Sequence, residues 1–225
     1  ISFAQLPPPR RGLPVSLLNL YELREDIFQA HVSYQLGLLY FLANDPQVPK
    51  KLKERVNRFG LDPKEFKETG YWPHQLYVRE GRRMLSDYVM TQANCESKRT
   101  VDDSIGLASY PMDSHSCQRV VVKEKGTMTV RNEGNMGYKC PQPYPIAYRS
   151  IVPKKEECNN LLVPLCLSAS HVAYGSIRME PVFMIMGQSA GVAASLAMAA
   201  DVSVQDIDMD KLRQHLEAEK QVLYP

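Results

Sequence analysis

The sequence is poor in glycine, and this excludes one common kind of nucleotide site. None of its 12 glycines is arranged as G-x-G-x-x-G or G-x-x-x-x-G-K-[ST], the patterns whose backbone amides cradle phosphates at the start of a helix. The five cysteines contain no C-x-x-C pair, and H-E-x-x-H does not occur. We therefore expect neither a glycine-rich pyrophosphate site nor a metal site in this chain.

An excess of charge of either sign is also lacking. The 27 Lys and Arg residues nearly balance the 25 Asp and Glu residues, which leaves a net charge of +2 at pH 7. A field this weak gives no reason to expect nucleic acid or an anionic membrane surface as a partner. The odd number of cysteines argues against a fully paired disulfide framework. The first residues, ISFAQLPPPRRGLP, lack the apolar core of a signal peptide and an initiator Met, so we expect a processed or truncated chain.

One stretch, residues 181–200, has twenty residues without a charge and is long enough to span a bilayer. Polar side chains at Gln188 and Ser189 interrupt it, and its second half is mostly alanine and glycine. Small residues suit a helix packed closely against a sheet, so we predict a buried helix and no membrane span. We expect Gly187 and Gly191, four residues apart, to allow that close packing.

The remaining patterns predict a mixed α/β (α+β) fold. Apolar periodicity and capping residues predict helices over 22–43, 47–58, from Asp62 onward, over 76–85, and after Asp208 or Asp210. A β-hairpin is predicted about Lys125-Gly126, a strand or extended loop over 144–153, and a strand covered on both faces over 160–168. The order is helices, then β-structure, then a strand, a loop and a long helix.

The block from residue 161 to 200 carries the most chemistry. A predicted strand ends in polar residues, a loop contains Tyr174, Ser176 and Arg178, and Pro181 stands where a long helix would begin. Free amides and the dipole at a helix N-terminus favour a ligand oxygen that gains negative charge. By itself this arrangement is a modest signal, because many α/β proteins contain it.

Five segments, taken together and in order, resemble the FAD-dependent oxidoreductase family of the glutathione-reductase-like superfamily, whose members are sometimes called xanthan-lyase-like. They are YQLGLLYFLANDPQVP (34–49), GYWPHQLYVREGRRMLSDYVMT (70–91), DDSIGLASYPMDSHSCQR (102–119), YPIAYRSIVPKKEECNNLLVPLCLSASHVAYGSIRMEPVFMIMGQSAGVAASLA (144–197) and VQDIDMDKLRQHL (204–216). The resemblance implies the C-terminal half of a two-domain enzyme. Residues 1–143 would be part of the substrate domain, and residues 144–225 would be the closing strand, loop and helix of the FAD-binding domain.

The resemblance also implies roles for particular residues. Near the flavin it places Ser170, His171, Arg178, Met179, Glu180, Val182 and Phe183. On the substrate side it places Asp113, His115, Tyr148 and Arg149, with His171 or His115 as the catalytic base. The helix that carries Gly187 and Gly191 would pack against the sheet of the FAD-binding domain. FAD would not be held by this chain alone, because its pyrophosphate finds no glycine-rich cradle here.

Two functions remain open at this point. The first is hydride transfer from a small organic substrate to FAD, with a second polypeptide or an N-terminal FAD-binding segment completing the enzyme. The alternative is a non-catalytic structural or assembly module derived from the same fold. Individual residues also have structural interpretations: His171 could cap a strand end, Arg178 could pair with Glu180 on the surface, and Asp113 and His115 could form a loop pair.

Overall fold

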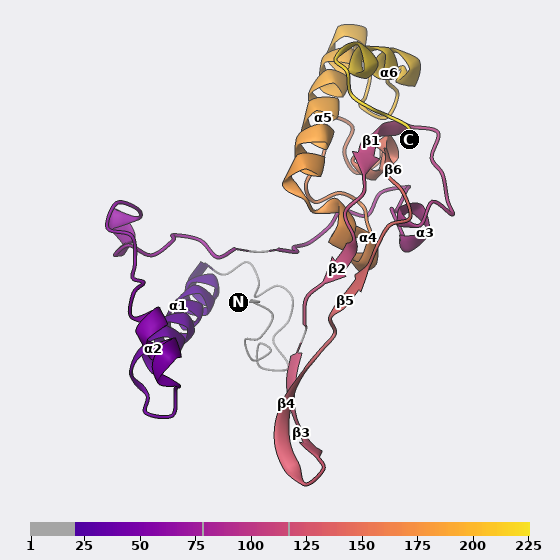
Figure 1. The fold of residues 1–225 in the computed structure, drawn as a ribbon. Helices are drawn as coiled ribbons and strands as arrows, with labels where there is room; N and C mark the ends of the chain where they lie inside the picture. Colours follow the sequence, from indigo (N-terminus) through magenta and orange to yellow (C-terminus); the bar gives the residue numbers. More distant parts are fainter. Residues whose placement is uncertain (1–20, 78, 117) are drawn as a thin grey trace. The chain divides into compact units, whose positions relative to one another are not determined.

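The computed structural model describes residues 21–77, 79–116 and 118–225, which form two compact units divided at residue 78 (Figure 1). Helices are combined with small antiparallel sheets, which confirms the predicted mixed α/β (α+β) class. The proline-rich first twenty residues, which the sequence predicts to be extended, lie outside the described residues.

The described residues of the first unit form two α-helices and one short 3₁₀ helix: α1 (Tyr21–Asn44), α2 (Lys50–Val56) and η2 (Lys67–Thr69). The helices predicted over 22–43 and 47–58 are thus confirmed. The helix predicted from Asp62 is wrong. Asp62 instead closes a turn, accepting the Lys64 amide through Oδ1 at 2.8 Å. Phe66 then adopts a left-handed conformation (φ 51°), which ends any right-handed helix at that point.

The second unit holds three two-stranded antiparallel sheets. Their strands are β1 (Ser104–Ala108) with β6 (Tyr144–Ala147), β2 (Met112–Ser114) with β5 (Met136–Tyr138), and β3 (Gln118–Glu124) with β4 (Thr127–Glu133). Figure 1 shows the β3–β4 hairpin extending from the β2–β5 pair. The hairpin predicted about Lys125-Gly126 is confirmed, with both residues at positive φ (48° and 86°) as a tight turn between twisted strands requires.

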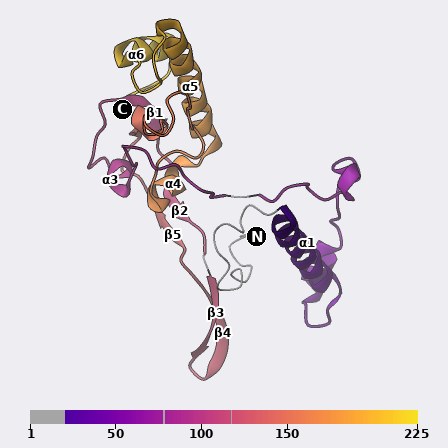
Figure 2. The same ribbon diagram turned by 180° about the vertical axis from the view of Figure 1, so that it is seen from behind.

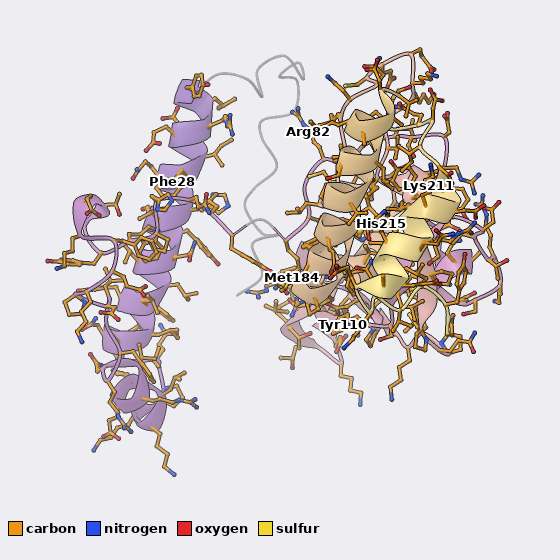
Figure 3. The ribbon with its side chains drawn as sticks, turned by 90° about the horizontal axis from the view of Figure 1, so that it is seen from above. Phe28, Arg82, Tyr110, Met184, Lys211 and His215 are labelled. Atoms are coloured by element: carbon orange, nitrogen blue, oxygen red, sulfur yellow. The ribbon has the colours of Figure 1, made fainter. Side chains whose placement is uncertain are left out.

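The helices of the second unit are α3 (Gln92–Cys95), η3 (Tyr148–Ser150), α4 (His171–Ile177), α5 (Glu180–Ala200) and α6 (Met209–Ala218). Figures 1 and 2 show α5 and α6 side by side, with β1 next to α5. In Figure 3 Met184 lies at one end of α5, and Lys211 and His215 lie on α6. The predicted cap of α6 is confirmed, because Asp208 accepts the amides of Asp210 and Lys211.

Two predicted elements of this unit do not form. Residues 76–85, predicted as a helix with Gly81 in its middle, are extended where described, and the Met84 amide donates to Cys166 O at 2.8 Å. Residues 160–168, predicted as a strand, make no sheet in the described chain. Pro164 has no amide to donate. Leu161 and Leu165, which would share one face of a strand, are 48% and 54% exposed, and Cys166, which would lie on the other face, is also exposed.

Helix α5 is the one helix in the described part of the chain that is long and apolar enough to cross a membrane. This is weak evidence for a span, because core helices have the same length and composition. One face of α5 is buried through Val182, Met186, Ser189, Ala193 and Ala197. It packs there against β1 and α6, as expected for a core helix.

The opposite face of α5 is open. Met184 and Met198 are 74% and 83% exposed. A Cβ atom added at Gly187 or at Gly191 would meet no described atom within 4 Å. No described element packs closely against these glycines, so the expectation that they permit close packing against another sheet stays a prediction. The open face, defined by Met184, Gly187, Gly191 and Met198, has no covering element here.

We expect Gly187→Leu to raise the free energy of unfolding by up to about 1 kcal/mol, because leucine favours a helix more than glycine does and the added side chain meets open space. Urea unfolding of the two proteins measures the difference. Ala193→Leu is the matched control, since Ala193 on the buried face is 0% exposed and the same side chain should there destabilise the fold. A clear loss of stability in Gly187→Leu would contradict this prediction.

The core near α3 contains ionisable groups that burial keeps neutral. Burial raises the pKa of the Cys95 thiol from 9.0 to about 11, and it also raises the pKa of the Tyr144 and Tyr148 hydroxyls. Between pH 9 and pH 11 the unfolded thiol loses its proton while the folded one keeps it. The free energy of unfolding should therefore fall across this window, by up to about 2 kcal/mol for Cys95.

Urea unfolding at several pH values checks this expectation. In Cys95→Ala the free energy of unfolding should depend less on pH between pH 9 and pH 10, the range in which the tyrosines contribute least to that dependence. A wild-type stability that stays constant up to pH 11 would contradict the assignment of Cys95 as a buried neutral thiol.

Candidate functional site

The polar centre of the second unit is a carboxylate that sequence reasoning did not assign to the site. The side chain of Glu80 is 20% exposed, and its Oε2 lies 2.6 Å from His171 Nδ1. Its Oε1 lies 3.3 Å from Arg178 Nη1, and Oε2 lies 3.6 Å from Arg83 Nη1. These contacts join Glu80 to Arg83, His171 and Arg178; His171 in turn contacts Ser114, and Arg178 contacts Asp113. We call these six residues the Glu80 cluster.

His171 begins α4 and reaches two other segments through its ring. Its Nδ1 meets Glu80, and its Nε2 lies 3.1 Å from the Ser114 hydroxyl on β2. The preceding residue, Ser170, is the N-cap of α4 and accepts the Ala173 amide at 3.3 Å. The alternative in which His171 caps a strand end is wrong, because the described residues just before it form only one isolated β-bridge, between Ala169 and Met90, and the ring contacts two other side chains.

Arg178 is the buried cation of the cluster, with a side chain that is 2% exposed. Its Nη2 donates to the Asp113 carbonyl at 2.8 Å and lies 3.2 Å from Asp113 Oδ2. The predicted alternative of a surface pair with Glu180 is wrong, since the partners are Glu80 and Asp113. Two carboxylates offset the cost of placing this charge out of water. Its Nε and Nη1 are buried donors without a hydrogen-bond partner among the described residues, so the contact between Nη1 and Glu80 Oε1 is an ion pair without hydrogen-bond geometry.

Asp113 links the predicted substrate residues to the cluster. Its Oδ2 lies 3.1 Å from His115 Nε2 and also meets Arg178. Asp113 and His115 are therefore a pair, as the loop alternative proposed, and Arg178 ties this pair to the rest of the site. Of the predicted site residues, the structure brings together Asp113, His115, His171 and Arg178.

Tyr148 and Arg149 lie elsewhere in the same unit. Arg149 pairs with Asp103 at 2.9 Å and with Asp102 at 2.8 Å, and the hydrogen bond that it donates to Asp103 raises the pKa of its guanidinium. Tyr148 donates to Val204 O at 2.7 Å. They line a cavity of about 180 Å³ whose other walls are Asp87, Val152, Pro153 and Gln205. The bonds that the structure gives these two residues go to partners outside the Glu80 cluster.

The start of α5 offers backbone donors. Its N-cap residue, Met179, makes no side-chain capping bond, and Pro181 follows in the first turn. The Phe183 amide is already used, because it donates to Met179 O at 2.9 Å. This leaves the amides of Glu180 and Val182 at the positive end of a 21-residue helix, where they suit an electron-rich ligand oxygen.

A hydrolase-like pattern that sequence reasoning missed proves structural. Residues 187–191 read GQSAG, which matches the G-x-S-x-G spacing of a nucleophilic serine. Ser189 lies inside α5 and is 0% exposed, and its hydroxyl donates to Ile105 O at 2.8 Å. In hydrolases this serine stands exposed on a turn between a strand and a helix. The described residues also contain no group of three His, Cys, Asp or Glu side chains that could hold a metal ion.

Comparison with known families gives one match. The sequence model of the family described as FAD dependent oxidoreductase matches residues 16–216. Neither the curated proteins nor the solved structures contain a match to this chain. The matched range covers the whole Glu80 cluster and all of α5.

Proposed function

Because the chain belongs to the FAD dependent oxidoreductase family, we propose that it is the substrate-side, C-terminal part of an enzyme that transfers a hydride from a small organic substrate to FAD. The observation that carries this proposal is the Glu80 cluster. A histidine lies there between a carboxylate and a hydroxyl, beside a buried arginine. The cluster adjoins the uncapped start of α5, because Arg178 precedes that helix by only two residues. The superfamily assignment and the boundary between residues 143 and 144 stay predictions from the resemblance.

The donors at this site suit one part of FAD. The Glu180 and Val182 amides and the unpartnered Arg178 Nε fit the carbonyl edge of a flavin ring, which becomes electron-rich on reduction. No glycine-rich turn in the sequence can hold the pyrophosphate. We therefore propose that a second polypeptide or an N-terminal segment supplies that site. When bound, FAD supplies the hydride acceptor.

The protein's own contribution is to orient the substrate and to accept its proton. We assign the proton to His171, because its ring is anchored on one nitrogen and presents the other to a hydroxyl. His115, paired with Asp113, is the second candidate. Arg178 fixes Asp113 and Glu80 relative to each other and adds positive charge near the start of α5.

The open face of α5 supports the proposal of a missing half. Exposed apolar surface along a helix usually marks an interface. Small residues at Gly187 and Gly191 would allow a sheet to approach closely. We propose that the sheet of the FAD-binding half covers Met184, Gly187, Gly191 and Met198. A chain that keeps this interface but never binds FAD would be the non-catalytic alternative.

The test uses the chain completed by its FAD-binding half. We expect the purified protein to carry FAD, and a panel of small alcohols and amines to contain a compound that bleaches the flavin absorbance without oxygen. His171→Gln should retain FAD but slow flavin reduction by about 100-fold or more. His215→Gln, which changes an exposed histidine on α6, is the control and should not change the rate of flavin reduction. A completed protein without flavin, or with flavin that no compound of the panel reduces, would favour the non-catalytic alternative.

A further inference from the structure

The two ring nitrogens of His171 have different partners, and this fixes their roles. Nδ1 lies 2.6 Å from Glu80 Oε2, and Nε2 lies 3.1 Å from Ser114 Oγ. An ionised carboxylate can only accept a hydrogen bond, so Nδ1 must carry a proton. In a neutral ring Nε2 then has the lone pair, so in this contact the Ser114 hydroxyl is the donor; the Gly134 carbonyl, 3.4 Å from Ser114 Oγ, is the other acceptor within its reach.

Glu80 is itself held in place by two arginines. Arg178 approaches Oε1, and Arg83 approaches Oε2. The first is buried, and the second is fixed by a bond from its Nε to Ala169 O at 2.9 Å and by stacking 5.1 Å from the Tyr174 ring centre. The carboxylate therefore has little freedom to leave the histidine, which is the arrangement of an oriented base.

We propose that Glu80 is a positioning residue that keeps the proton of His171 on Nδ1, and that the group His171 is built to deprotonate is a hydroxyl. The second half of this statement rests on the proposed function. It identifies the substrate as an alcohol whose hydroxyl donates to Nε2 in place of Ser114. The carbon loses a hydride to oxidised flavin, the hydroxyl loses its proton to Nε2, and a carbonyl forms, so atoms and electrons balance.

The first test needs neither substrate nor FAD turnover. In the full protein labelled with nitrogen-15 histidine, we expect NMR to show that the neutral form of His171 carries its proton on Nδ1. In Glu80→Gln we expect both tautomers of the neutral His171 ring, because an amide can both donate and accept. Glu80→Asp keeps a group that can only accept, so its His171 should again carry the proton on Nδ1 alone. Ser114→Ala should leave it unchanged, since Glu80 alone sets it.

The control and the contrary outcomes are equally specific. Glu217→Gln makes the same charge change on an exposed part of α6 and should leave His171 as it is. Circular dichroism establishes that each variant is folded. If Glu80→Gln does not fold, the position of the proton in the wild-type protein decides the question. Wild-type protein with the proton on Nε2, or Glu80→Gln with the wild-type form, overturns the positioning role.

The second test uses the completed, FAD-loaded protein and an alcohol that reduces it. Glu80→Gln should lower kcat by about 10- to 1,000-fold with little change in KM, because orientation of the base and not substrate binding is lost. Flavin reduced by amines and by no alcohol would overturn the hydroxyl assignment alone. Flavin reduced by no compound would count against the proposed function, while the NMR result would still decide the role of Glu80.

Discussion

Arg178→Ala is expected to lower the free energy of unfolding by about 3 kcal/mol, which is at the low end for breaking a buried ion pair because both partners are partly exposed. The change leaves Glu80 and Asp113 without their shared cation, at positions where their side chains are only 20% and 32% exposed. It also removes the donor to Asp113 O. Urea unfolding measures the loss. Arg178 is thus a structural residue as well as a candidate flavin contact.

Arg178→Lys is the informative companion variant. Lysine keeps the positive charge but lacks the planar guanidinium that contacts both Glu80 and Asp113. We therefore expect the free energy of unfolding of Arg178→Lys to lie between those of the wild type and Arg178→Ala. Arg24→Ala, at an exposed position of α1, is the control and should be nearly silent. An Arg178→Ala protein as stable as the wild type would show that the two carboxylates do not depend on this cation.

Gly175→Ala is expected to destabilise the second unit by about 3 kcal/mol, at the upper end for an added methylene in a packed site. A Cβ atom at this position would lie 2.5 Å from Asp113 O and 3.1 Å from Asp113 N. These are backbone atoms of β2, which cannot rotate aside as a side chain can. Helix α4 and β2 must therefore move apart, and the distance between His171 Nε2 and Ser114 Oγ must grow with them.

Two measurements separate the effects of Gly175→Ala. Urea unfolding gives the stability, and the histidine NMR signals report the loss of the Ser114 contact while the Glu80 contact remains. Gly137→Ala on β5 is the control, because an added Cβ there meets no described atom within 4 Å and the change should stay within about 0.5 kcal/mol. Equal stabilities for the two variants would mean that β2 and α4 are not in close contact.

Long elements with a strong local pattern could be predicted from the sequence. The periodicity of α1, the Asp208 cap of α6 and the turn residues of the β3–β4 hairpin are local signals, and all three elements form. Two elements predicted from weak or conflicting local patterns did not form. Gly81 sits inside the false helix over 76–85, and Pro164 sits inside the false strand over 160–168. The short helix α4 was missed, although its N-cap, Ser170, is a residue type that favours that position.

The site was only partly predictable for a related reason. The resemblance to a family indicated Asp113, His115, His171 and Arg178, and the structure brings these residues together. It gave no role to Glu80, because nothing local marks one glutamate in an arginine-rich segment as the partner of a histidine far along the chain. It grouped Tyr148 and Arg149 with the site, yet their bonds go to Val204, Asp102 and Asp103.

The spacing of the Glu80 cluster along the chain sets when it can form. Ser114 and His171 are 57 residues apart, Asp113 and Arg178 are 65 apart, and Glu80 and His171 are 91 apart. Closing such long loops costs chain entropy that local helices and hairpins avoid. During synthesis Glu80 and Asp113 emerge from the ribosome well before α4 does, and both carboxylates stay hydrated until then. The site therefore cannot assemble before α4 is available, whereas the β3–β4 hairpin, whose contacts are local, has no such requirement.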